Sequence, residues 1–164
     1  MPDPTPVPRL QPSDVSLAHA LVRVGLGVNI AMHGLVRLPD LPGFAAGLEA
    51  DFADTFLPGA LVYASGYGIV FAEAVIGTLL VLGLFLRPVL AAGTALMIVL
   101  IFGTCLLQNW GTAGSQLVYL GIYGLLLGSA GFDRFSLDGK RAAGRGGRRR
   151  FGRWEKRRTG RLLD

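Results

Sequence analysis

Polar and ionisable side chains form one stripe along an apolar segment of this chain, predicted as a helix at residues 17–36. At about 100° of rotation per residue the stripe is about 120° wide. Side chains of these types can bind a ligand or carry a proton. Within an apolar helix they are costly unless they face the protein interior or a water-filled cavity. The members of the stripe are His19, Arg23, Asn29, His33 and Arg37.

A single acid, Glu73, lies in the middle of a second apolar segment, predicted as a helix at residues 59–85. An unpaired carboxylate in a low-dielectric medium takes up a proton, so a paired acid is the less costly arrangement. We therefore predict that Glu73 meets His33 and Arg37 in one polar cluster. This cluster is either a structural ion pair or a functional site. The candidates for a ligand or proton-relay site are Glu73, His33, Arg37, Asn29 and Arg23.

Two members of the stripe also have simpler interpretations, because they lie near one end of the predicted helix. The long side chain of Arg23 could extend to lipid head groups, and we favour this interpretation for Arg23 taken alone. His19, at the start of the helix, is expected at the membrane interface.

Aromatic and amide side chains gather toward the other end of the same predicted helices. A pocket lined by them would suit a flat amphipathic ligand such as a quinone head group. Tyrosine and tryptophan at membrane interfaces are also common without any ligand, and that alternative is the favoured one. The pocket-lining candidates are Tyr63, Tyr67, Gln108, Trp110, Gln116, Tyr119 and Tyr123.

The composition requires a membrane to hold these elements. Of 164 residues, 51% are hydrophobic and only 16% are charged, and the 45 residues between Arg87 and Asp133 carry no charge. A water-soluble surface needs more charge than this, and about 20 apolar residues cross a bilayer. We predict an all-α membrane protein, a bundle of four transmembrane helices with a short interfacial helix between the first two. The spans are expected at about 17–36, 59–85, 89–107 and 115–132.

The distribution of charge predicts the orientation and the domain organisation. Residues 1–139 hold 5 basic and 9 acidic residues, whereas residues 140–164 hold 11 basic and 2 acidic ones. Basic segments stay on the cytoplasmic side, so four spans place both termini in the cytoplasm. Residues 1–14, rich in proline, are expected to be a disordered arm before a transmembrane domain at 15–139. The basic residues 140–164 are expected to form a cytoplasmic tail.

The tail is expected to bind anionic lipid, because basic residues next to a membrane are attracted to an acidic leaflet. A protein partner or a nucleic acid is a less favoured alternative for this Arg/Gly-rich segment. The lone Cys105 excludes an internal disulfide and is expected to be a small buried residue. No zinc-ligand or other metal pattern is present. The lipid-binding candidates are Arg148, Arg149, Arg150, Arg153, Trp154, Lys156, Arg157 and Arg158.

Three segments together resemble the DoxX family of small bacterial membrane proteins: LVRVGLGVNIAMHGLVRL, then YGIVFAEAVIGTLLVLGLFLRPVLAAG, then GFDRFSLDG. The marks in this chain are Arg23 with His33, Gly34 and Arg37, then Glu73 and the turn at Leu86, Arg87 and Pro88, and the exit motif Phe135, Ser136, Leu137 and Asp138. The resemblance implies a four-helix bundle in a bacterial plasma membrane. It also implies a link to membrane redox chemistry, since the family takes its name from a subunit of a thiosulfate:quinone oxidoreductase.

Three functions are consistent with these features. The first is an accessory subunit of a membrane oxidoreductase system, with a quinone-like ligand, a proton relay and a soluble redox partner. The second is a small carrier or permeability factor that uses Glu73 and works as a homo-oligomer. The third is a scaffold that presents the basic tail. The chain has no catalytic motif of its own, so enzymatic activity stays undecided.

Overall fold

The computed structural model describes residues 11–138, and this part of the chain is entirely helical, without a strand. The predicted basic tail and its lipid-binding candidates lie outside the described residues. Five α-helices are joined by short connections, with one 3-10 turn between the first two helices and a second after the last one. The α-helices are α1 (Pro12–Leu35), α2 (Leu41–Asp51), α3 (Gly59–Leu82), α4 (Leu86–Leu106) and α5 (Trp110–Gly128), and the 3-10 turns are η1 (Leu38–Asp40) and η2 (Ala130–Phe132).

Proline, glycine and two short polar side chains explain where several helices begin and end. Pro12 starts α1 because its fixed φ suits the first helical position, so α1 includes three residues assigned to the predicted arm. Gly83 ends α3 in the left-handed conformation, with φ of 66°, three residues before the predicted end of that span. The side chain of Asp40 accepts a hydrogen bond at the start of α2, and that of Asn109 does so at the start of α5.

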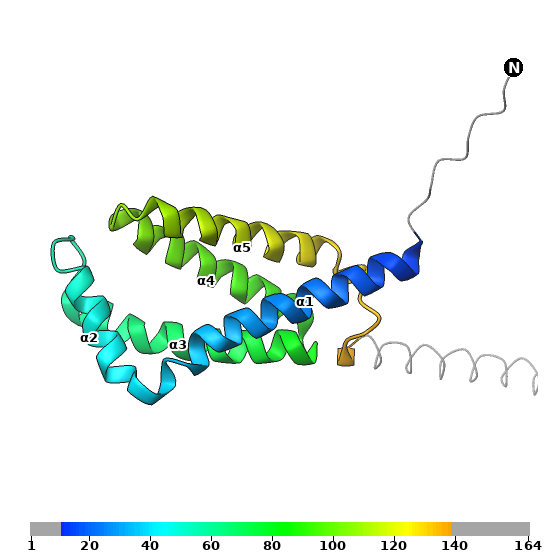
Figure 1. Ribbon diagram of the computed structural model, residues 1–164, viewed down its shortest axis with the longest axis horizontal. Coiled ribbons are helices and arrows are strands. Elements are labelled where there is room, and N and C mark those ends of the chain that lie inside the picture. Colours follow the sequence, from blue (N-terminus) through cyan, green and yellow to red (C-terminus); the bar gives the residue numbers. More distant parts are fainter. Residues whose placement is uncertain (1–10, 139–164) are drawn as a thin grey trace, which may run out of the picture.

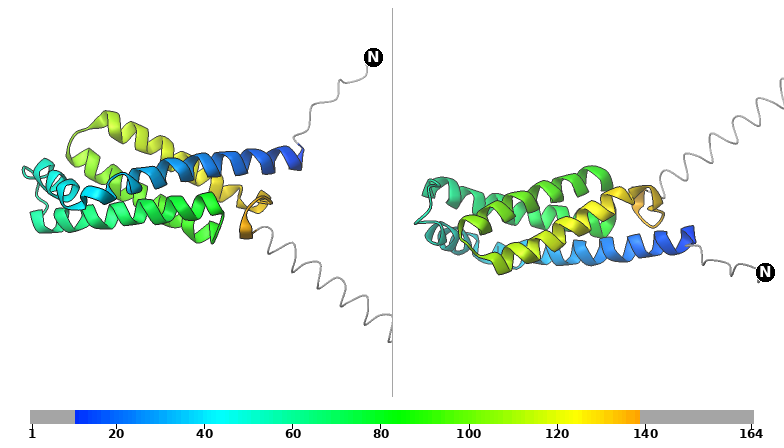
Figure 2. Two further views of the ribbon diagram at one scale, coloured as in Figure 1. Left: turned by 60° about the horizontal axis from the view of Figure 1, so that its bottom comes forward. Right: turned by 90° about the horizontal axis from the view of Figure 1, so that it is seen from above.

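The long helices pack as two pairs. Figures 1 and 2 show α1 beside α3 and α4 beside α5, with α2 at the end where α3 begins. The α1–α3 pair is close because glycines face the partner backbone. A Cβ atom on Gly27 or Gly34 would collide with the α3 backbone, and one on Gly77 would collide with the α1 backbone. Such small-residue contacts hold helices together in a membrane through van der Waals packing.

Three segments contain helices long and apolar enough to cross a membrane: Pro12–Asp51, Gly59–Leu82 and Leu86–Leu106. The 19-residue helix α5 is not among them, because its first turns contain Thr112, Ser115 and Gln116. The predicted count of four spans is therefore not confirmed, and neither is an interfacial position for α2. The outward faces of the long helices carry large apolar side chains, among them Phe71, Val99 and Leu125.

Candidate functional site

An ion pair joins Glu73 to Arg37 inside the bundle. Arg37 Nη1 lies 2.6 Å from Glu73 Oε2, and only 3% of the Glu73 side chain is exposed, against 34% for Arg37. Arg37 lies just after α1, so its side chain reaches α3 from the connection to α2. Its guanidinium also lies 4.7 Å above the ring of Phe44 in α2, a favourable contact for a cation. Three elements thus hold one buried charge pair.

A tyrosine of α5 completes the surroundings of Glu73. Tyr123 is fully buried and interacts electrostatically with Glu73. Its ring lies against Gly93 of α4, where a Cβ atom would collide with it. Within the described part of the chain the Tyr123 hydroxyl has no hydrogen-bond partner. A buried hydroxyl without a partner is costly, so a donor is available for a group not present in the structure.

An apolar cavity lies toward the end of the bundle where α2 is found. It has a volume of about 340 Å³ and lies between α2, α3 and α4. Val62 and Ile69 of its wall lie within about 40° of Glu73 around the α3 axis, and Ile69 is about 6 Å nearer the start of α3. Leu61 and Ser65 of the same wall lie about 80–120° from Glu73, and Glu73 itself does not line the cavity. Its lining consists of Leu48, Phe52, Leu57, Leu61, Val62, Ser65, Ile69, Val99, Leu100, Phe102, Gly103, Thr104 and Leu107.

The structure does not bring His33 into this cluster, contrary to the prediction. His33 is exposed on the surface of the bundle, and it interacts electrostatically with Arg37 but makes no hydrogen bond among the described residues. The reason is angular: the face of α1 that packs on α3 contains Gly27 and Gly34, about 100–120° away from His33. Asn29 is half-buried, and its side-chain oxygen has no partner in residues 11–138.

None of the seven predicted pocket-lining residues lines the apolar cavity. Tyr63 and Tyr67 instead contact each other, with their hydroxyl oxygens 3.2 Å apart. Gln116 accepts a hydrogen bond of 2.8 Å from Thr104, which does line the cavity. The remaining members are separated: Tyr119 packs against the core, Tyr123 lies beside Glu73, and Gln108 and Trp110 are exposed.

A second polar cluster lies at the opposite end of the bundle, and it corrects the interpretation of Arg23. Arg23 does not extend to head groups: it is 2% exposed, and its Nη1 donates hydrogen bonds to the carbonyl oxygens of Leu80 and Val81 at the end of α3. A cation there also complements the helix dipole. His19 is buried between helices rather than exposed, and its Nδ1 lies 2.9 Å from Ser129 Oγ.

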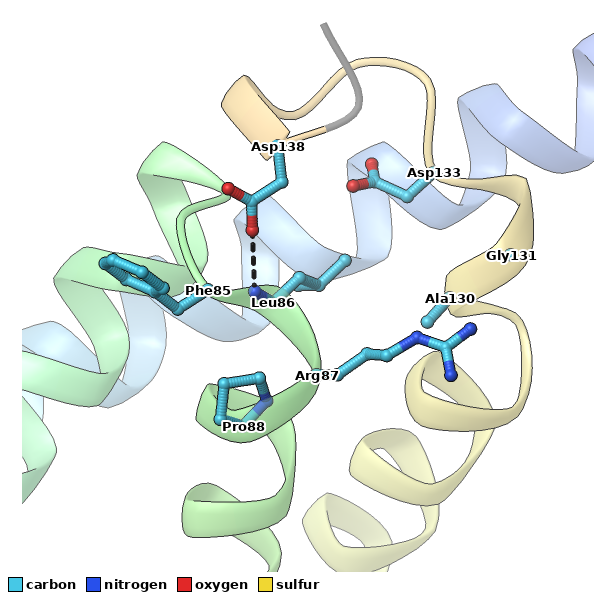
Figure 3. Close-up of a pocket in the computed structure, with 8 residues that line it drawn as sticks. All are labelled: Phe85, Leu86, Arg87, Pro88, Ala130, Gly131, Asp133 and Asp138. Carbon is cyan, nitrogen blue, oxygen red and sulfur yellow. Dashed lines mark hydrogen bonds between the residues drawn. The ribbon is translucent and has the colours of Figure 1, made fainter. Parts of the chain in front are cut away.

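Figure 3 shows a second cavity next to this cluster, between the start of α4 and the segment after α5. Its volume is about 470 Å³. The backbone N–H of Leu86 donates a hydrogen bond of 3.0 Å to Asp138 Oδ2, so a distant acid caps α4. Arg87 and Asp133 also line the cavity. We did not predict a role for Ser129, Asp133 or Asp138, although the absence of a capping side chain at Phe85 was a signal that another residue must cap α4.

The described residues contain no group of three His, Cys, Asp or Glu side chains that could hold a metal ion. Cys105 is a free cysteine of intermediate burial on α4. The polar groups at the Glu73 cluster are a buried carboxylate, its guanidinium partner and a phenol.

Comparison with known proteins identifies one family. The DoxX family model matches residues 18–105, which include the Arg37–Glu73 pair and the small-residue contacts between α1 and α3. Comparison with the curated proteins found no match, and comparison with the solved structures found none.

Proposed function

Because the chain belongs to the DoxX family of membrane proteins, we propose that it is an accessory subunit of a membrane oxidoreductase system with a site for a quinone-like ligand. The observation that carries this proposal is the buried pair of Glu73 and Arg37, with the unpartnered Tyr123 hydroxyl beside it. An ionisable group inside a membrane protein by default indicates a functional site.

The polar cluster at Glu73 and the apolar cavity, which Glu73 does not line, would serve different parts of a quinone-like ligand. The apolar cavity of about 340 Å³ can hold an aromatic ring or the start of an isoprenoid chain. Reduction of a quinone takes two electrons and two protons, and the electrons would come from a redox partner. The chain's own contribution is proton transfer, and Tyr123 can donate a hydrogen bond to a quinone oxygen. Glu73, when its contact with Arg37 opens, can take up a proton from water and pass it to the reduced quinone, once for each of the two protons. In this proposal Glu73 is a proton-carrying group.

The same proposal includes a specific placement in the membrane. We propose four spans, formed by α1, α3, α4 and α5, with α2 at the outer interface and both termini in the cytoplasm of a bacterial cell. The exposed apolar side chains of α5, such as Val118 and Leu125, support the fourth span, since they would lie in lipid. The basic residues 140–164 support the orientation and are proposed to bind anionic lipid.

Quinone binding to the full chain in lipid nanodiscs tests the proposal. We expect the wild type to retain a short-tailed ubiquinone or menaquinone analogue, and Glu73→Gln to bind it at least about fivefold more weakly. Gly103→Leu fills the cavity and is expected to abolish binding, because a Cβ atom there already lies 3.2 Å from the ring of Phe52. Gly114→Leu is the matched control, since a Cβ atom at Gly114 meets nothing within 4 Å.

Two outcomes would contradict this function. If the wild type binds neither analogue, or if Gly103→Leu and Glu73→Gln bind as well as the wild type, the quinone site is wrong. Solute uptake by proteoliposomes that depends on Glu73 and needs no quinone would instead support the alternative, a small carrier.

A further inference from the structure

The cavity between the start of α4 and the segment after α5 is lined by one basic and two acidic residues, and these three differ in whether another group of the protein binds them. Asp138 accepts a hydrogen bond from the Leu86 N–H, so the α4 N-terminus already compensates its charge. Arg87 is exposed and has no ion-pair partner within residues 11–138. The Oδ1 atom of Asp133 is buried and has no hydrogen-bond partner in the same range.

Arg87 and Asp133 line the same cavity but do not pair with each other. Figure 3 shows the two carboxylates on one side of the opening and the Arg87 guanidinium on the other. A ligand that fits must therefore present an anion to Arg87 and a hydrogen-bond donor, best a cation, to Asp133. A purely anionic ligand is disfavoured, because it would leave the Asp133 carboxylate without a cation.

The surroundings of the cavity indicate a membrane lipid as the occupant. Exposed aromatic rings lie at this end of the bundle: Phe85 is 62% exposed, Phe132 47% and Phe135 55%. Aromatic side chains at such a level are typical of the interface between lipid tails and head groups. A volume of about 470 Å³ is within the range of ligand sites.

We propose that this cavity binds the head group of phosphatidylethanolamine, with its phosphate at the guanidinium of Arg87 and its primary ammonium at the carboxylate of Asp133. Guanidinium groups recognise phosphate oxygens well, and a carboxylate accepts short, strong hydrogen bonds from an ammonium group. This site is separate from the Glu73 cluster, so it does not depend on the proposed quinone function. It also differs from the attraction of the tail to anionic lipid, because it selects a lipid with a primary ammonium group.

Native mass spectrometry of the full chain, exchanged into defined lipids, tests the site. We expect phosphatidylethanolamine adducts to be retained about tenfold more than those of phosphatidylcholine, whose trimethylated nitrogen has no N–H to donate to Asp133. The mono- and dimethylated lipids should fall between these two. Phosphatidylglycerol, which lacks the ammonium, should also bind weakly at this site. Because this series uses the unaltered protein, it does not depend on the folding of a variant.

Variants then assign the two contacts. Asp133→Asn should remove the preference for phosphatidylethanolamine over phosphatidylcholine, and Arg87→Gln should weaken both adducts about equally. Arg134→Gln and Asp54→Asn, two exposed positions that do not line the cavity, are the matched controls and should change neither.

Equal retention of the ethanolamine and choline lipids would overturn the proposal, as would a preference that survives Asp133→Asn. Glycerophosphoethanolamine distinguishes a free head group from a lipid: if it binds while the lipids show no preference, the assignment to a membrane lipid is wrong.

Discussion

Removal of Arg37 should destabilise the protein in a pH-dependent way. In Arg37→Met the Glu73 carboxylate loses its partner while its side chain stays 97% buried. Breaking a buried ion pair by removing one partner costs about 3–5 kcal/mol. Because Arg37 itself is 34% exposed, water screens part of the interaction, and we expect the lower end of that range.

Arg37→Met can also fold with Glu73 protonated, and this limits the loss of unfolding free energy. In this case Glu73 binds a proton when the variant folds. The free energy of protonation is unfavourable by roughly 4 kcal/mol at pH 7 and roughly 1 kcal/mol at pH 5, because a glutamate in the unfolded chain titrates near its ordinary value. Folding of the variant then takes up a proton, so its stability rises as the pH falls. We expect a deficit of about 3 kcal/mol at pH 7 and about 1 kcal/mol at pH 5.

Reversible unfolding in mixed detergent and SDS micelles, followed by circular dichroism at both pH values, measures this deficit. The double variant Arg37→Met/Glu73→Met has no charge left at the site of this pair, so its stability should be close to that of the wild type and should not show the pH dependence of Arg37→Met. Arg134→Met, at an exposed position, controls for general effects of losing a positive charge. An equal deficit of Arg37→Met at pH 5 and pH 7, or additive losses in the double variant, would refute the reasoning.

Other changes probe the contacts between the helices. Gly77→Ala should lower the unfolding free energy by about 1–3 kcal/mol in the same assay, because its methyl group collides with α1, whereas Gly68→Ala, with nothing within 4 Å, should be neutral or slightly stabilising. Asp138→Ala should cost about 1 kcal/mol by removing the cap of α4, and Asp138→Ser should recover part of it. Arg23→Met should cost about 1–3 kcal/mol, and faster hydrogen exchange confined to the last turn of α3 would locate the loss; unchanged exchange there would contradict the capping role.

The sequence was sufficient for the helices because their signals are local. Charge-free runs indicated the long segments, and Gly59 and Gly83 mark where α3 begins and ends. Glu73 could be identified as a buried acid because nothing else in its segment is charged. Its contact with Arg37 was predicted as part of a cluster with His33, although depth alone favoured Asn29 or His33 as the partner.

The side chains that the sequence did not place correctly depend on rotation and on distant partners. A rotation of about 100° about the axis of α1 separates a His33 that faces the bundle from one that faces outward. The stripe of polar residues alone could not show which of its residues pack on α3. Arg23 was predicted to reach lipid head groups, whereas in the structure it binds backbone carbonyl groups at the end of α3. Tyr123 looked like an interfacial residue, because only the packing of α5 on α4 places it beside Gly93.

The cap of α4 has a consequence for the order in which the protein is made. Leu86 lies 52 residues before Asp138, so the N-terminus of α4 leaves the ribosome long before the acceptor that completes it. The backbone N–H of Asp138 also donates to Gly83 O, so the same residue closes the turn between α3 and α4 from both sides. Because chains are synthesised from the N-terminus, this turn becomes complete only after α5 has been made. The two contacts of Asp138, the last described residue, can therefore form only after α1 to α5 have been synthesised.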